Sequence, residues 1–162
     1  MNLKDKHIIY FIGIGGIGMS ALARWFKSLG CDVAGYDRTP TPLTDQLQTE
    51  GIDIHFDDRI EHIPTHLISE KTKSLVIYTP AIPDDHKQFN YLLSKGLDIL
   101  KRAEVLGILS KEMFTIAVAG THGKTTTSSM IAHILYSNHV NSLSFLGGIS
   151  SNYDSNFLIC KN

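Results

Sequence analysis

The sequence lacks the features that would assign it to several large classes of protein. It has only two cysteines, Cys31 and Cys160, and they share no motif, so no disulfide framework is predicted. No apolar run approaches membrane-spanning length. The 15 basic residues nearly balance the 16 acidic ones, so no basic field indicates a nucleic acid as partner. The opening residues, Met1 to Lys6, lead directly into a strand without a signal peptide, and we expect a cytoplasmic protein that binds no membrane.

Metal-binding and nucleophile patterns are also missing. Eight histidines are present, but no His-Glu-x-x-His motif and no Cys/His cluster occurs. His62 and His66 are four residues apart, yet Pro64 lies between them and disrupts a helix face. No zinc site and no nucleophile triad is therefore predicted. Hydrophobic residues make up 43% of the chain and charged residues 19%, which is a globular composition.

The first motif is a glycine loop between a strand and a helix. Residues 7–12 are an apolar run typical of a buried strand, and Gly13-Ile-Gly-Gly-Ile-Gly18 follows at once. A helix is predicted over residues 16–29, and a second strand over 32–36 that ends at Asp37. A Gly-x-Gly-x-x-Gly loop in a β-α-β unit, with an acid about twenty residues later, is typical of a dinucleotide-type site. Gly13 would make the turn, Gly15 would admit a pyrophosphate, and Gly18 would let helix and strand pack.

The alternation of strands and helices then continues. Strands are predicted at 53–56, 74–78 and 97–100, and helices after Thr41-Pro42, around residues 89–93 and over 102–110. The loop at 79–83 follows a strand at the sheet edge where open α/β sheets bind ligands. The pattern predicts an α/β protein with a Rossmann-like parallel sheet covered by helices on both faces.

The second motif is a phosphate loop. Residues 114–119 are predicted to form a buried strand, and Gly120-Thr-His-Gly-Lys-Thr125 opens a helix with its apolar side chains on one face; these are Met130, Ile131, Ile134 and Leu135. Backbone N–H groups at a helix start bind anions, a lysine suits terminal phosphates, and a threonine directly after it is a usual Mg²⁺ ligand. The loop is shorter than a Walker loop, because only Thr121 and His122 separate Gly120 from the Gly-Lys pair. His122 could donate to a phosphate or carboxylate, or face solvent.

A domain boundary is predicted near Ser110. Residues 1–110 suffice for a small Rossmann-like domain, whereas 111–162 supply a strand, a helix and strands near 143–146 and 156–160. These later elements would begin a P-loop-type ATP-binding α/β domain without completing it. We expect the chain to be the N-terminal part of a longer protein.

Both motifs, in this order, resemble the Mur ligase family. The matching segments are residues 13–23 and 119–127, with Gly35-Tyr-Asp37, Thr79-Pro-Ala-Ile-Pro83, Arg102-Ala-Glu-Val-Leu106 and Phe145-Leu-Gly-Gly148. The chain departs from the family at Asp57-Asp58, where Gly-His is common, and at residues 83–86, where Pro-Glu-Asp-Asn is common. The family's acidic metal-binding segment and its C-terminal domain have no counterpart in this chain.

The resemblance implies an ATP-dependent ligase of peptidoglycan synthesis, closest to the member that joins L-alanine to UDP-N-acetylmuramate through an acyl phosphate. It implies that ATP binds at Gly120, Thr121, His122, Gly123, Lys124, Thr125 and Thr126, with Lys124 catalytic and Thr125 a Mg²⁺ ligand. It implies that the UDP-sugar binds at Gly13, Gly15, Gly16, Ile17, Gly18, Asp37, Thr79 and Ala81. Asp37 would contact the ribose or the uracil. This chain alone is expected to be inactive.

Two other classes remain open from the residues alone. The glycine loop and Asp37 also fit an NAD(P)-binding oxidoreductase or a nucleotide-sensing domain, but these leave the Gly-Lys-Thr loop without a role. A P-loop binding or switch module would use that loop without ligase chemistry.

Overall fold

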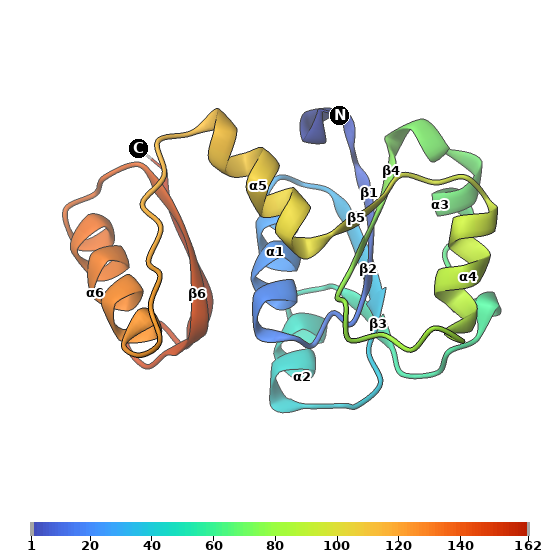
Figure 1. Ribbon diagram of the computed structural model, residues 1–162, viewed down its shortest axis with the longest axis horizontal. Coiled ribbons are helices and arrows are strands. Elements are labelled where there is room, and N and C mark those ends of the chain that lie inside the picture. Colours follow the sequence, from blue (N-terminus) through green and yellow to red (C-terminus); the bar gives the residue numbers. More distant parts are fainter. Residues whose placement is uncertain (1, 162) are drawn as a thin grey trace.

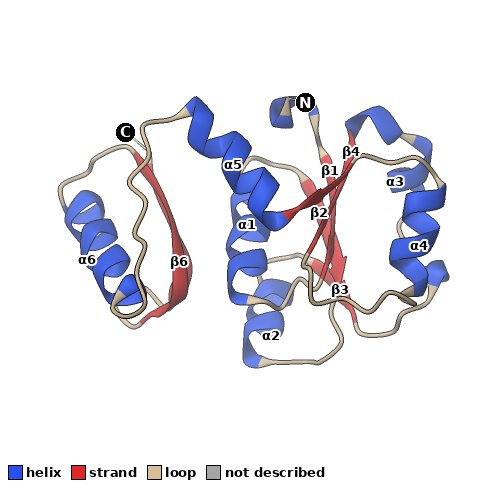
Figure 2. Ribbon diagram, in the orientation of Figure 1, coloured by secondary structure: helices blue, strands red, loops and turns tan. Residues whose placement is uncertain are grey.

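The core of the protein is one five-stranded parallel sheet, as the sequence predicts (Figures 1 and 2). The computed structural model describes residues 2–161. The strands lie in the order β3-β2-β1-β4-β5. Their bounds are β1 Ile8–Ile12, β2 Asp32–Tyr36, β3 Asp53–His55, β4 Ser74–Tyr78 and β5 Ile99–Lys101. The central strand β1 pairs with β2 and β4 along its whole length, so it is buried on both edges and both faces.

Helices cover both faces of this sheet. Figure 1 shows α1, α2 and α5 on one face and α3 and α4 on the other. Their bounds are α1 Ile17–Ser28, α2 Pro42–Thr49, α3 Thr65–Ser69, α4 Lys87–Ser94 and α5 Arg102–Glu112, with short 3₁₀ helices η1 Leu3–Asp5, η2 Ile60–His62 and η3 Lys71–Lys73. The alternation along β1 produces two cores: Ile9 and Phe11 pack on the α1 side, whereas Tyr10 and Ile12 pack on the α3–α4 side.

Two helix boundaries follow from local chemistry. Gly30 has a φ of +81° directly after α1, which is the left-handed conformation that closes many helices. At α2, the Thr41 hydroxyl accepts the Thr44 N–H, and the Thr44 hydroxyl accepts the Thr41 N–H. This reciprocal cap, with Pro42 at the first helical position, confirms the predicted helix start.

The remaining elements form a smaller unit beside α1 and α5. It contains α6 Lys124–Ser137 and the hairpin of β6 Ser142–Ser150 and β7 Ser155–Cys160. The two strands are antiparallel, unlike the five strands of the main sheet. A short turn at residues 151–154 joins them, and only antiparallel neighbours can be joined so directly. The predicted boundary near Ser110 falls in the last turns of α5, and this division of the chain stays a prediction.

The predicted strand over residues 114–119 is wrong. This segment has no regular secondary structure, and Phe114 is 96% exposed. A buried strand needs neighbours that accept and donate its backbone hydrogen bonds, and no strand of the described chain pairs with this one. The local pattern was strand-like, but its partners are not supplied within these residues.

Smaller corrections concern element ends and faces. The last strand of the sheet is Ile99–Lys101 and not 97–100. On α6, Met130 and Ile134 are 61% and 60% exposed, so they do not share the packed face with Ile131 and Leu135. The face that packs on the hairpin carries smaller residues, with Ala132 buried. Among the described residues, no helix is both long and apolar enough to cross a lipid bilayer.

Candidate functional site

The glycine loop lies at the carboxyl edge of the sheet, at its topological switch point. The chain runs from β1 outward to β2 and β3 on one side, and later to β4 and β5 on the other. The loops after β1 and β4 therefore diverge at one place, where open α/β sheets bind ligands. Gly13 and Thr79 meet there, because a Cβ on Gly13 would lie 2.5 Å from the Thr79 methyl group. Ala81 is exposed on the same loop.

A side chain at each of three loop glycines would meet a different obstacle. Gly13 has a φ of +86°, which fits its predicted role in the turn. A Cβ on Gly15 would lie 2.9 Å from both the Asp37 carboxylate and the Thr44 methyl group. A Cβ on Gly18 would lie 2.0 Å from the Arg102 guanidinium. The expected contact of Gly18 is helix-to-strand packing, and the structure instead places an arginine side chain there.

Asp37 is hydrogen-bonded to the glycine loop. Its Oδ2 accepts the N–H of Gly15 at 2.7 Å, and its Oδ1 accepts the N–H of Thr39 at 3.2 Å. The carboxylate therefore lies within the loop that the sequence assigns to a pyrophosphate. Its predicted contact with the ribose or the uracil stays a prediction.

The start of α1 has free hydrogen-bond donors. Gly16 caps the helix without a side-chain bond, and no acid lies in its first turn. Within the part of the chain that the structure describes, the N–H groups of Ile17 and Gly18 have no acceptor. Free N–H groups and the positive end of the helix dipole together favour an anion here.

The phosphate loop has more backbone N–H groups without an acceptor than the start of α1 has. Gly120 and Gly123 have φ values of +147° and +75°, and Gly123 is the residue before α6. None of the N–H groups of residues 121–126 has an acceptor among residues 2–161. The Lys124 ammonium donates to the carbonyls of Gly120 at 2.6 Å and Thr121 at 3.2 Å, so it lies across the loop. The structure thus presents a cradle of backbone donors and one cation, all solvent-accessible.

The hairpin lies between the two loops. On one side, Gly147 and Gly148 of β6 approach Thr125, and a Cβ on either would lie 3.1–3.2 Å from its side chain. On the other side, the Asn156 amide of β7 donates to the Ile17 carbonyl at 2.5 Å and to the Ser20 hydroxyl at 2.7 Å. Figure 1 shows the hairpin between α6 and α1. The hairpin therefore contacts both the start of α6 and the start of α1, next to the two loops.

Asn156 belongs to a buried polar cluster that sequence analysis did not find. Its side-chain oxygen accepts from Arg24 of α1, and Arg24 also donates to both carboxylate oxygens of Glu50 at 2.9 Å. Arg24 is 8% exposed and Asn156 fully buried. Arg24 and Asn156 are 132 residues apart in the chain, and no local pattern signals such a pair.

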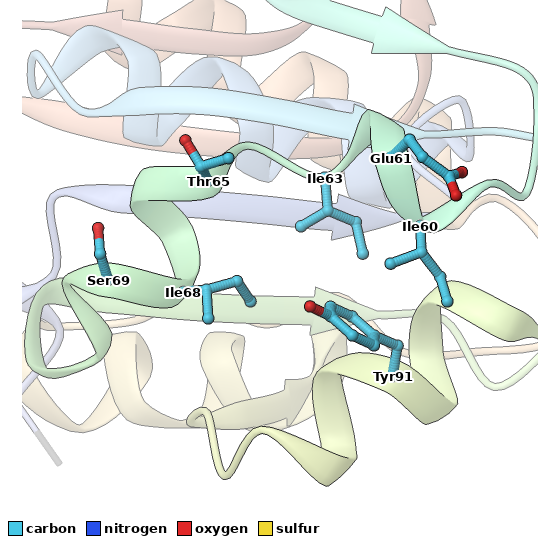
Figure 3. Close-up of a pocket in the computed structure, with 7 residues that line it drawn as sticks. All are labelled: Ile60, Glu61, Ile63, Thr65, Ile68, Ser69 and Tyr91. Carbon is cyan, nitrogen blue, oxygen red and sulfur yellow. The ribbon is translucent and has the colours of Figure 1, made fainter.

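Two hollows lie away from these loops. One, of about 460 Å³, lies between η2, α3 and α4 on the opposite face of the sheet (Figure 3). Its lining includes three isoleucines and Tyr91, and Glu61 is its one charged residue among those described. The other, of about 1010 Å³, lies under the irregular segment that includes Ile116 and Val118, against α6 and β6. Neither is lined by residues of the glycine loop or of the loop at residues 120–125.

No metal site is complete within the described residues. They contain no group of three histidine, cysteine, aspartate or glutamate side chains placed to hold an ion. A Mg²⁺ ion on the Thr125 hydroxyl would therefore have no cluster of three such side chains beside it in this part of the chain. His122 is exposed in the phosphate loop, and both of its proposed roles stay predictions.

Comparison with known proteins agrees with this arrangement. A family profile described as "Mur ligase family, catalytic domain" matches residues 8–113. The UDP-N-acetylmuramate–L-alanine ligase of Flavobacterium psychrophilum is 56% identical over 158 residues, which are 98% of this chain and 35% of that protein. The enzyme of the same name from Porphyromonas gingivalis is 55% identical over 151 residues, which are 93% and 33%.

Solved structures give the same result. The UDP-N-acetylmuramate-alanine ligase of Thermotoga maritima is 35% identical with a TM-score of 0.81, over 94% of this chain and 34% of that one. A murein peptide ligase of Psychrobacter arcticus is 27% identical with a TM-score of 0.80, over 96% and 34%. This chain spans about a third of the length of these relatives.

Proposed function

The chain belongs to the Mur ligase family, and from that premise we propose that it is the sugar-nucleotide and phosphate-loop part of a ligase that joins L-alanine to UDP-N-acetylmuramate. The observation that carries the proposal is the pair of anion-binding loops held by one hairpin. A nicotinamide-dependent enzyme would use the first loop and leave the second without a role. The identity of 56% to a relative with this name supports the substrate assignment.

The first loop would bind the UDP-sugar. The N–H groups of Ile17 and Gly18 are free to donate to its diphosphate. The predicted role of Gly15 is to allow a close approach of the backbone to that diphosphate. Gly13, Gly16, Thr79 and Ala81 would form the rest of this wall. Asp37, whose Oδ2 accepts the Gly15 N–H, would accept hydrogen bonds from a ribose or uracil. We also propose a cytoplasmic location, where UDP-sugars and ATP are available together.

The second loop would bind ATP. The N–H groups of residues 121–126 would surround its phosphates, and Lys124 would turn from the loop carbonyls to the terminal phosphate. The Thr125 hydroxyl would hold Mg²⁺ together with ligands outside the described residues. When bound, Mg²⁺ neutralises charge on the transferred phosphoryl group.

The proposed reaction has two steps. A lactyl carboxylate oxygen of UDP-N-acetylmuramate attacks the γ-phosphorus of ATP, and ADP leaves to give an acyl phosphate. The amine of L-alanine then attacks the acyl carbon, loses a proton and expels phosphate. Lys124 contributes most where negative charge develops on the transferred group, and such contributions are typically a few kcal/mol.

Substitution at Gly15 tests the assignment of the first loop. Calorimetric titration of residues 1–162 with UDP-N-acetylmuramate and with NADH should show binding of the UDP-sugar only. Gly15→Val should abolish that binding, because a side chain there meets Asp37 and Thr44 and would displace the loop whose N–H groups face the diphosphate.

Gly107→Val is the matched control, because a Cβ on Gly107 has no atom within 4 Å. It should bind the UDP-sugar like the unsubstituted chain, and circular dichroism should show both variants folded. Tight NADH binding without UDP-N-acetylmuramate binding would overturn the ligase assignment.

A further inference from the structure

We propose that Arg102 binds the diphosphate of the sugar nucleotide and forms the cationic wall of the glycine loop. The inference rests on the proposed function and adds a residue that the glycine-loop motif does not include. Arg102 is the first residue of α5 and follows β5, so it stands at the carboxyl edge of the sheet. It is an exposed side chain beside the switch point.

The Arg102 side chain lies against Gly18. A Cβ on Gly18 would lie 2.0 Å from Nη1, 3.0 Å from Cζ and 3.2 Å from Cδ of Arg102. The guanidinium therefore lies directly against the first turn of α1, in space that any other residue at position 18 would occupy. Gly18 is helical and does not have a positive φ, so its missing side chain has a packing explanation here and no conformational one.

The charge of Arg102 has no partner in the free protein. Across residues 2–161, the structure gives it no ion pair and no hydrogen bond. The nearby Glu104 carboxylate is already used, because it accepts the N–H of Lys101 at 2.6 Å. An unpaired guanidinium retains all five donors for a ligand.

The neighbourhood is electrostatically unfavourable without an anion. The start of a helix carries the positive end of its dipole, and cations are stabilising at the opposite end. The first turn of α1 has no acid and two free N–H groups, and a cation lies against it. A doubly charged anion that contacts both the free N–H groups of α1 and the guanidinium of Arg102 would satisfy both. Arginine is suited to this, because its planar fork binds two phosphate oxygens at once.

Asp37 makes a cation beside the bound diphosphate more important. Its carboxylate lies on the Gly15 N–H, so a bound diphosphate would experience repulsion from it. A cation on the far side of the ligand would offset that repulsion. Backbone donors alone would leave the ligand with one anionic neighbour and no full positive charge.

The test is a set of titrations with ligands that differ in phosphate content. Arg102→Gln should weaken binding of both UDP and UDP-N-acetylmuramate by about 10- to 100-fold, the range for a lost charge-assisted pair. The loss for UMP should be smaller, because one phosphate is missing. Arg102→Lys should recover part of the loss, since it keeps the charge without the fork.

Lys111→Gln is the matched control, because it removes the same charge from the exposed far end of α5. It should change UDP affinity less than about twofold. Equal UDP affinity of Arg102→Gln and the unsubstituted chain would overturn this inference and leave the proposed function intact. A loss for UDP-N-acetylmuramate but none for UDP would move the contact to the sugar or its carboxylate, and would also overturn it. Absence of any UDP-N-acetylmuramate binding by the unsubstituted chain would overturn the proposed function.

Discussion

At the scale of single residues, substitution of Lys124 should affect ATP binding and leave UDP-sugar binding unchanged. Its ammonium lies on the carbonyls of Gly120 and Thr121, within reach of the backbone donors of the same loop. Lys124→Ala should weaken ATP binding by about 10- to 100-fold, because a charged hydrogen-bond donor is lost. UDP-N-acetylmuramate affinity should remain within about twofold. Calorimetry with each nucleotide measures both effects.

The control for Lys124 is Lys111→Ala, which removes a lysine from the surface of a different helix. It should alter neither titration. An equally large loss of UDP-sugar affinity in Lys124→Ala would assign this lysine to the first site.

Two histidines should make stability depend on pH. Burial lowers the pKa of His86, although Asp58 and Asp85 oppose the shift. Burial also lowers the pKa of His55, whose Nε2 lies 3.0 Å from the Tyr10 hydroxyl and 2.8 Å from the Gln88 amide. Both side chains are therefore neutral in the folded protein at a pH where the unfolded chain binds protons. The free energy of unfolding should be steady above about pH 7 and fall as the pH drops below about 6.5.

His86 allows this effect to be isolated. Its Nδ1 accepts the Phe89 N–H at 3.2 Å, and its Nε2 is buried with no partner in the described chain. His86→Asn keeps an acceptor at this helix start and removes the titrating group. Urea unfolding from pH 5.5 to 7.5 should show a shallower pH dependence for the variant. An unchanged slope would show that His86 does not contribute.

At the scale of elements, the contact between β7 and α1 should be a main source of stability for the smaller unit. Asn156→Ala removes an acceptor from the buried Arg24 and a donor from the Ile17 carbonyl. Leaving buried polar groups unpaired should lower the free energy of unfolding by about 2–3 kcal/mol. Chemical denaturation of the purified chain measures it.

Asn152→Ala is the control, because Asn152 is exposed in the turn between β6 and β7. Its effect should stay within about 0.5 kcal/mol. A similar small effect for Asn156→Ala would show that the polar cluster adds nothing beyond the apolar packing around it.

Elements differed in how far the sequence predicted them. Strands β1, β2 and β4 were predicted to within a residue, because each is a short apolar run followed by glycine, aspartate or proline. The segment 114–119 had the same local pattern and failed, since a strand exists only where neighbours complete its hydrogen bonds. Local composition indicates that a segment favours extended backbone. It does not indicate which neighbouring strand would pair with it.

At the scale of the whole molecule, the order of the motifs predicted the fold class and the position of the glycine loop. The β-α-β alternation predicted a parallel sheet, and the structure adds the strand order and the switch point. The polar cluster around Asn156 and the approach of Arg102 to Gly18 could not be predicted. Both depend on which distant segments meet in space, and one sequence has no periodicity that records this.

The chain by itself should not complete the reaction. The described residues hold no cluster of three histidine, cysteine, aspartate or glutamate side chains that could bind a metal ion, and the chain spans about a third of its relatives. Phosphate release from ATP with UDP-N-acetylmuramate and L-alanine should therefore equal the background rate in a coupled assay. Turnover above background that Lys124→Ala removes would contradict this.

The contact between the hairpin and α1 also has a consequence for synthesis on the ribosome. Trp25 packs against Phe145, and Phe157 belongs to the same core as α1. The sheet and its five helices have all been made by Glu112, yet this side of α1 stays uncovered until Phe157 appears. At usual elongation rates that interval is roughly 2–9 s, far longer than a small domain needs to collapse. The nascent chain therefore carries an aromatic surface exposed to water for several seconds, and this is the stage at which a chaperone would bind it.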